Sequence, residues 1–191
     1  MRRAVPFGAW LLLLAGSAQA AQGTGAPGDA AVDELVSAVA ARVALADAVA
    51  RSKWQTHQAI EDAPRERLVI ASASAEGQAV GLDATQLQAF FADQITASKI
   101  VQYALHAQWA SGETRVPADA PPDLAGTIRP ELDHLQHRLI AALAASRVQR
   151  ALPECTTAIA RSALERANAL KMDAVARAAL DYALAHACVG P

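Results

Sequence analysis

The stretch DELVSAVAARVALADAVARSKW, residues 33–54, carries apolar residues at the spacing of an α-helix. We therefore predict one long first helix from Asp33 to about Ala59. Two cations of this stretch, Arg42 and Lys53, are eleven residues apart. At about 100° per residue, that spacing returns to within about 20° of the same face. The apolar positions that define the helix are Leu35, Val36, Val39, Val43, Ala46, Val49 and Ala50.

The position of the two cations leaves two interpretations open. A buried charge without a partner costs several kcal/mol, so a helix face that points into a core rarely carries two of them. Either Arg42 and Lys53 lie at the solvent edge of the apolar stripe, or an anion binds between them.

The chain after the first helix contains clear helix boundaries. Asp62 is a good N-cap and Pro64 is tolerated in a first turn, so a second helix should begin there. It should run to about Val80, where Gly81 ends it. The segment 83–86, Asp-Ala-Thr-Gln, fits an N-cap followed by Gln at the third helical position, which predicts a third helix ending near Ser111.

The second half of the chain predicts three more helices. After a linker at 111–122, a fourth helix should start near Leu124 or Pro130 and end at Arg150. Two shorter helices should follow, at about 154–169 and 173–188. Since no segment alternates with the period of a strand, we expect an all-α, single-domain bundle of about six helices with a long first helix. It would span 33–191, with three core helices in 33–111 and the C-terminal helices in 122–191.

The first twenty residues are typical of a secretory signal peptide. Arg2 and Arg3 precede a short apolar run, and Ala18-Gln19-Ala20 forms a cleavage signal. The apolar run is too short to span a bilayer. We expect cleavage after Ala20, a flexible lead-in over 21–32, and a periplasmic or secreted protein without a membrane anchor.

Charge and cysteine content narrow the range of functions. Cleavage would remove Arg2 and Arg3 and change the formal net charge from −2 to −4, which gives no electrostatic basis for binding nucleic acid or an anionic membrane. Cys155 and Cys188 are the two cysteines. In an oxidising compartment such a pair predicts one disulfide, and two free buried thiols are the alternative.

Familiar catalytic motifs are absent from the sequence. It contains no G-x-S-x-G, Gly-rich phosphate loop, H-E-x-x-H or C-x-x-C. His134 and His137 lack supporting carboxylate or Cys spacing, so we expect no metal site. The remaining candidates are hydrogen-bond donors without a nucleophile, and together they indicate an anion site: Arg42, Lys53, Arg65, Arg138, and the pair Ser98 and Gln102, which share a helix face.

The order and spacing of these residues resemble a known family. The pattern consists of Arg42-x10-Lys53-Trp54, Ile60-Glu61-Asp62-x-x-Arg65-Glu66 and Asp93-Gln94-Ile95-x-x-Ser98-x-x-x-Gln102. It resembles the all-helical, AroQ-class (type II) chorismate mutases. The signal peptide, the Pro-Pro-Asp-Leu segment at 121–124 and the two-cysteine tail resemble the exported gamma subclass of that family.

The resemblance implies an isomerase of the shikimate pathway that converts chorismate to prephenate. This reaction is an intramolecular pericyclic rearrangement, so no nucleophile, metal or cofactor is needed. Catalysis would consist of holding the compact diaxial conformer of the substrate and stabilising negative charge on its ether oxygen. A site made of donors without a base fits that chemistry.

The resemblance also implies a role for each candidate residue. Arg42 would bind a substrate carboxylate, while Lys53 would reach both a carboxylate and the ether oxygen. Gln102 would donate to the same oxygen. The other expected substrate contacts are Ser98 and Arg138 at a carboxylate, Asp62 (through its backbone) and Glu66 at the hydroxyl, and Arg65 lining the site.

Two other functions stay open at this point. The chain could be an enzyme that eliminates pyruvate from isochorismate, because related helical proteins use a similar cationic pocket. It could also be a non-catalytic exported helical protein that binds a dicarboxylate or a protein partner. A homodimer is implied by the resemblance alone.

Overall fold

The computed structural model describes residues 27–120 and 123–189 of the chain. That part contains seven α-helices, one short π-helix and no strand, which confirms the prediction of an all-α fold. The predicted signal peptide, residues 1–20, lies outside the described residues, as does most of the expected lead-in.

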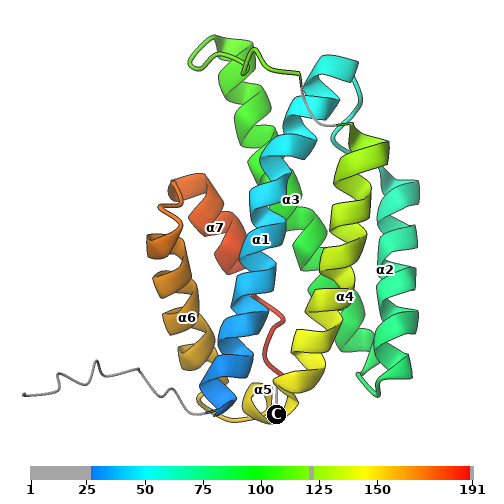
Figure 1. Ribbon diagram of the computed structural model, residues 1–191, viewed down its shortest axis with the longest axis vertical. Helices are drawn as coiled ribbons and strands as arrows, with labels where there is room; N and C mark the ends of the chain where they lie inside the picture. Colours follow the sequence, from blue (N-terminus) through cyan, green and yellow to red (C-terminus); the bar gives the residue numbers. More distant parts are fainter. Residues whose placement is uncertain (1–26, 121–122, 190–191) are drawn as a thin grey trace, which may run out of the picture.

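Helix α1 (Pro27–Thr56) lies at the centre of the molecule (Figure 1). It contacts α3, α4, α6 and α7, and the seven apolar positions that predicted the helix are all buried. The helix begins at Pro27 instead of Asp33, because Val32 continues the apolar stripe and is buried in the core. Residues 27–32 are therefore helical, which corrects the expectation of a flexible lead-in up to residue 32.

The next two helices begin and end close to the predicted residues. Helix α2 (Ala63–Ala79) starts after Asp62, whose side chain accepts a hydrogen bond from the backbone N–H of Arg65 at 3.2 Å. Helix α3 (Ala84–Ser111) starts after Asp83, which accepts from the backbone N–H of Gln86 at 2.8 Å. Between them, Gly81 has a φ of +77°, a conformation that favours glycine. The N-cap residues thus set the start of both helices.

The predicted fourth helix is divided into three segments. A π-helix, η1 (Leu124–Ile128), precedes α4 (Arg129–Ala145), and α5 (Arg147–Arg150) follows after Ser146. The Ser146 hydroxyl donates to the carbonyl of Ala142 at 2.6 Å, at the point where α4 ends. This back-bond competes with continuation of the helix.

The C-terminal part consists of α6 (Cys155–Ala169) and α7 (Ala174–Ala183). The last helix ends at Ala183, earlier than the predicted residue 188. The tail beyond it is attached by the predicted disulfide between Cys155 and Cys188, whose Cα atoms are 5.9 Å apart. This disulfide joins the start of α6 to the residues that follow α7.

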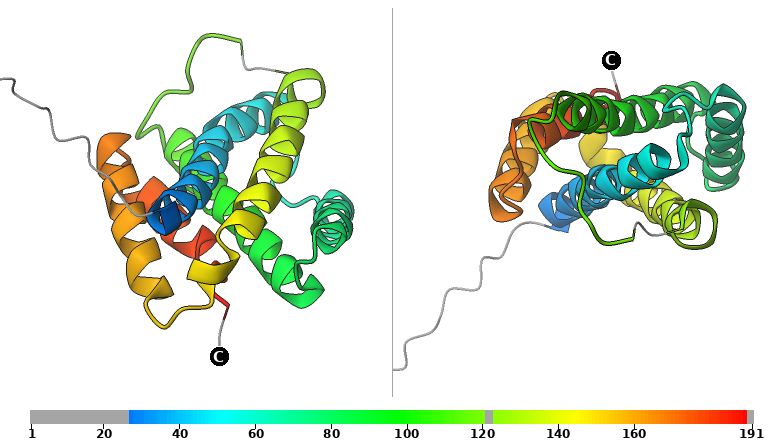
Figure 2. Two further views of the ribbon diagram at one scale, coloured as in Figure 1. Left: turned by 60° about the horizontal axis from the view of Figure 1, so that its bottom comes forward. Right: turned by 90° about the horizontal axis from the view of Figure 1, so that it is seen from above.

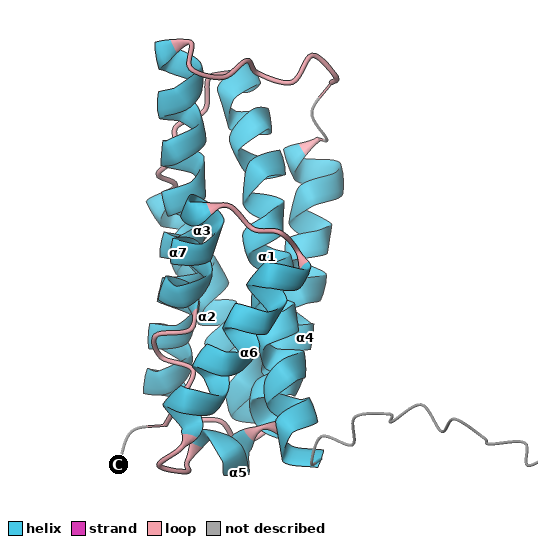
Figure 3. Ribbon diagram, turned by 90° about the vertical axis from the view of Figure 1, so that its left-hand side faces the viewer, coloured by secondary structure: helices cyan, strands magenta, loops and turns pink. Residues whose placement is uncertain are grey.

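The helices form two adjacent rows. Seen from above, α3 and α7 form one row and α1 and α4 the other, with α2 and α6 at opposite ends (Figure 2). Figure 3 shows that α6 and α7 cover only the lower part of α1 and α3. Helix α2 packs against α3 and α4, and α4 packs against α1. Most of the donors predicted above lie among these four helices. Among the described helices, none is long and apolar enough to cross a membrane.

Candidate active site

Arg42 is a buried cation of α1 whose side chain faces a cleft. The residue is 7% exposed, and its Nη1 donates to the carbonyl of Leu132 at 3.5 Å. Its Nε–H has no hydrogen-bond partner among the described residues. Burial lowers the pKa of Arg42 to about 10, although the nearby carboxylate of Asp133 opposes the shift. A guanidinium in this position has donors available for an anion.

The cleft lies between α1, α2, α3, η1 and α4. The apolar lining residues form part of its wall: Val49, Ile60, Val69, Ile95, Leu124 and Leu132. The polar and charged lining residues are Arg42, Lys53, Asp62, Arg65, Glu66, Ser98, Lys99, Gln102, Arg129, Asp133 and Gln136. The structure therefore brings together every predicted site residue except Arg138.

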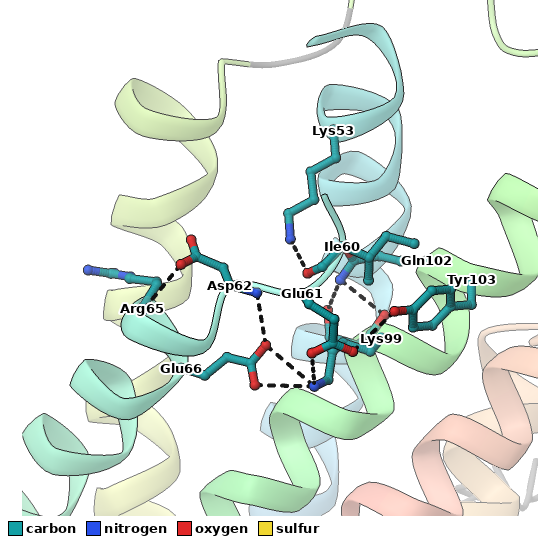
Figure 4. A network of polar contacts seen from close by, with 10 residues as sticks. Lys53, Ile60, Glu61, Asp62, Arg65, Glu66, Lys99, Gln102 and Tyr103 are labelled. Carbon is teal, nitrogen blue, oxygen red and sulfur yellow. Dashed lines mark hydrogen bonds and ion pairs between the residues drawn. The ribbon is translucent and has the colours of Figure 1, made fainter. Parts of the chain in front are cut away.

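Lys53 lies on the same side of α1 as Arg42 and reaches the cleft at the α1–α2 loop. Its Nζ donates to the carbonyl of Ile60 at 2.6 Å (Figure 4). Burial lowers the pKa of Lys53 from its ordinary value, and the carboxylates of Asp62 and Glu66 partly offset this effect. Because burial is the largest cause, the ammonium is only partly compensated by the protein.

Gln102 and Ser98 face the cleft from α3. The Gln102 side-chain Nε2 donates to the Ser98 hydroxyl at 3.0 Å and to the Ser98 carbonyl at 3.2 Å. The amide oxygen of Gln102 is buried and has no partner within the described residues. An amide nitrogen carries two hydrogens, so a ligand oxygen at this position would replace one of the two Ser98 acceptors.

The acidic side of the cleft is formed by the first turn of α2. The backbone N–H of Asp62 donates to Glu66 Oε1 at 3.2 Å, and Lys99 Nζ lies 3.2 Å from Glu66 Oε2. Figure 4 shows Glu66 between these two groups. A carboxylate can accept further hydrogen bonds beyond these, so Glu66 remains able to accept one from a ligand hydroxyl.

Arg65 lines the cleft from α2 and makes an ion pair across to α4. Its Nη2 is 3.3 Å from Asp133 Oδ1, and both side chains are well exposed. An exposed pair of this kind contributes little to stability. Arg65 can therefore exchange Asp133 for a ligand anion at small cost.

Arg138 lies outside the cleft, which corrects its expected role. Its Nε donates to Glu34 at 2.7 Å and its Nη2 to Ser37 at 3.3 Å, both in the N-terminal half of α1. The arginine of α4 that does line the cleft is Arg129. The two are nine residues apart, which is about half a turn out of phase at roughly 100° per residue. Because Arg129 faces the cleft, Arg138 lies on the opposite face of α4.

Four polar or charged lining residues were missed by the sequence analysis: Lys99, Arg129, Asp133 and Gln136. Three of them had a signal in the sequence, because the lining positions of α4 recur at helical spacing (Arg129, Leu132, Asp133 and Gln136). Lys99 follows Ser98 directly, but adjacent residues on a helix diverge by about 100°, so no spacing rule indicated it. Across the described residues, no three or more His, Cys, Asp or Glu side chains gather as a metal site would require.

Comparison with known proteins agrees with this geometry. Residues 29–103 match the family model of chorismate mutase type II. A solved chorismate mutase from Burkholderia phymatum is 38% identical, with a TM-score of 0.81, over 86% of this chain and 100% of that chain.

Two curated relatives are described as secreted chorismate mutases. The protein from Mycobacterium tuberculosis is 28% identical over 70% of this chain, and the one from Mycolicibacterium smegmatis is 34% identical over 58%. The chain spans 66% and 60% of the lengths of these relatives. The matched family region, the helical fold and the cationic cleft thus agree, and the chain belongs to the type II chorismate mutase family.

Proposed function

We propose that this protein is an exported chorismate mutase that converts chorismate to prephenate. The observation that carries the proposal is the buried guanidinium of Arg42, whose Nε–H is unpartnered among the described residues and which shares a cleft with Lys53. Two desolvated cations in one cleft favour a dianion, and chorismate carries two carboxylates. The solvent-edge interpretation of these cations does not fit, because Arg42 is buried.

The reaction needs stabilisation of charge rather than proton transfer. The ether C–O bond of the substrate breaks while a C–C bond forms within the same molecule, so no group enters or leaves. Negative charge develops on the ether oxygen, and we place Lys53 and Gln102 on either side of that oxygen as donors. Preorganised donors of this kind typically supply the largest share of catalysis.

The other cleft residues would hold the substrate in its reactive conformer. Arg42 and Arg129 would bind the carboxylates, with Ser98 and Arg65 as additional donors. The hydroxyl would lie beside the backbone N–H of Asp62 and the carboxylate of Glu66, which contact each other at 3.2 Å. Fixing the reacting carbons close together removes much of the entropic barrier.

A matched pair of arginines on α4 tests this assignment. Arg129→Ala should lower kcat/KM for chorismate about 100-fold, because a charge-assisted hydrogen bond contributes up to about 3 kcal/mol. Arg138→Ala is the control and should change kcat/KM less than about 2-fold, because it removes a pair with the half-exposed Glu34 and a hydrogen bond to Ser37, both outside the cleft. Equal losses in the two variants would contradict the assignment.

The same assay separates the alternative functions. Purified protein should be given chorismate and isochorismate in parallel, and prephenate and pyruvate should be measured. Pyruvate from isochorismate as the main product would indicate the lyase. Binding of a dicarboxylate without turnover of either substrate would indicate a non-catalytic binding protein.

Export and assembly are further parts of the proposal. Export is supported by the signal-like sequence of residues 1–20 and by relatives described as secreted. The mature protein recovered from the periplasm or medium should begin at Ala21, and an intact Met1 terminus there would argue against it. A homodimer is proposed from the family resemblance, and sedimentation should give twice the mass of one chain.

A further inference from the structure

A cluster of four side chains lies at the rim of the cleft, on the side of the α1–α2 loop. We refer to it as the rim cluster, and it consists of Glu61, Glu66, Lys99 and Tyr103 (Figure 4). Its only member with an expected role in the proposed reaction is Glu66. Glu61 stands in a quoted motif without an assigned role, and Lys99 and Tyr103 belong to no motif considered so far.

Lys99 is the centre of the rim cluster. Its Nζ lies 2.9 Å from Glu61 Oε2 and 3.2 Å from Glu66 Oε2. The hydrogen bond to Glu61 is the main cause that raises the pKa of Lys99, so the ammonium is charged throughout the neutral range. Lys99 is therefore engaged with protein carboxylates, unlike Arg42, whose Nε–H has no partner among the described residues.

The two carboxylates that pair with Lys99 differ in their exposure to solvent. Glu61 is more than half exposed, whereas the side chains of Glu66 and Lys99 are 23% and 20% exposed. An exposed ion pair contributes little, while a partly buried one constrains its members more strongly. The contact between Lys99 and Glu66 is thus the one that can affect the cleft.

Glu66 is oriented from two directions. The backbone N–H of Asp62 holds Oε1 and the ammonium of Lys99 holds Oε2. Both contacts hold Glu66 as an ionised carboxylate, which can only accept hydrogen bonds from a ligand. A ligand hydroxyl is the complementary group, and a ligand carboxylate would be repelled there.

We propose that Lys99 is a positioning residue that holds the Glu66 carboxylate as the acceptor for the ring hydroxyl of the substrate. This inference rests on the proposed function. Lys99 acts through Glu66 and does not touch the substrate. It thereby contributes to recognition of the hydroxylated ring, while the arginines recognise the carboxylates.

The test compares chorismate with an analogue that carries hydrogen in place of the ring hydroxyl. For Lys99→Met, kcat/KM for chorismate should fall about 10-fold relative to the unaltered protein, whereas kcat/KM for the analogue should change less than about 2-fold. Where turnover of the analogue is too slow to follow, its inhibition constant gives the same comparison. A fraction of misfolded variant would lower both rates equally, so the ratio is independent of folding.

Two further variants complete the design. Glu66→Gln combined with Lys99→Met should lower kcat/KM by no more than the larger single effect, because both changes remove one interaction. Tyr103→Phe is the control, because the Tyr103 hydroxyl donates to Glu61 and to no other group among the described residues. It should leave the ratio between the two substrates unchanged.

The outcomes separate this inference from the proposed function. If the unaltered protein turns chorismate over but Lys99→Met lowers the rates with both substrates equally, Lys99 supports the structure in general and the inference is wrong. Independent, multiplicative effects of Lys99→Met and Glu66→Gln would also overturn it. Absence of chorismate turnover in the unaltered protein would instead reject the proposed function itself.

Discussion

Arg42 shows how one side chain combines an electrostatic and a geometric requirement. Its guanidinium can form two parallel hydrogen bonds to a carboxylate, which an ammonium cannot copy. It also stays charged where burial disfavours charge, because its pKa falls from a high ordinary value only to about 10. Arginine is therefore the residue type that this position requires.

The substitution Arg42→Lys tests both requirements. We expect kcat/KM to fall at least 10-fold at neutral pH, because one hydrogen bond to the carboxylate is lost. Activity needs the charged side chain at residue 42. The activity is therefore present below the pKa of that side chain and is lost as pH rises through that pKa. A lysine side chain starts from an ordinary pKa of about 10.4, and the same burial lowers it further, so the loss should begin at lower pH than in the unaltered protein. A pH–rate profile with an unchanged alkaline limb would contradict this account.

Gln102 provides a donor whose availability does not depend on pH. In Gln102→Glu, the introduced carboxyl can donate to the ether oxygen only while it is protonated. Activity should therefore be highest in acid and should decline as pH rises through the pKa of that carboxyl, while the unaltered protein keeps a broad profile around neutrality. The measurement is kcat/KM between pH 4 and 8. A Gln102→Glu variant that stayed fully active at pH 8 would contradict a donor role.

Helical spacing places Ser98 with Gln102 and Arg42 with Lys53, and all four line the cleft. Asp62 and Glu66, expected from the family resemblance, line it as well. The prediction failed at Arg138, whose partner Glu34 is more than a hundred positions away in the chain. No local pattern distinguishes an arginine that faces a cleft from one that faces another helix. The choice between Arg129 and Arg138 depends on the rotation of α4 against α1, which is a property of packing.

At the scale of elements, the start of α3 decides where Ser98, Lys99 and Gln102 lie. Asp83 caps this helix with a 2.8 Å hydrogen bond from the backbone N–H of Gln86. Asp83→Ala should lower the free energy of unfolding by about 1 kcal/mol. The melting temperature should fall by about 2–4 °C, the response expected of a chain of this length. Asp83→Asn keeps an acceptor and is the control, so equal melting temperatures for the two variants would show that the cap contributes nothing.

Helix boundaries that depend on local chemistry were predictable, and those that depend on tertiary structure were not. Asp62, Asp83 and Gly81 signal their boundaries through capping and backbone conformation. The predicted capping box at Asp83 is only half formed, because the Gln86 side chain donates to the distant carbonyl of Cys188. Likewise, the separation of α5 from α4 depends on the Ser146 back-bond, which the sequence pattern did not indicate.

At the scale of the whole molecule, the C-terminal helices support the fold without forming the cleft. None of the cleft residues comes from α6, α7 or the tail, within the residues that the structure describes. The tail is attached by the Cys155–Cys188 disulfide and by the backbone N–H of Val189, which donates to the carbonyl of Arg150 at 2.8 Å. Stability and catalysis should therefore be separable.

The double substitution Cys155→Ser with Cys188→Ser tests this separation. We expect the free energy of unfolding to fall by about 2–4 kcal/mol, because the disulfide closes a long loop of the unfolded chain. Below the lowered unfolding transition, kcat/KM should stay within about 2-fold of the unaltered protein. Chemical denaturation and steady-state kinetics measure the two quantities. A large loss of activity in the folded variant would show that the tail shapes the cleft.

The most direct test of the central claim compares the purified protein, beginning at Ala21, with its Lys53→Ala variant. Chorismate loss and prephenate formation should be followed together for both. The account predicts that the unaltered protein forms prephenate and that Lys53→Ala is about 100- to 1000-fold slower, the loss expected for one donor to a developing oxyanion. Equal rates for the two proteins, or no prephenate from either, would contradict it.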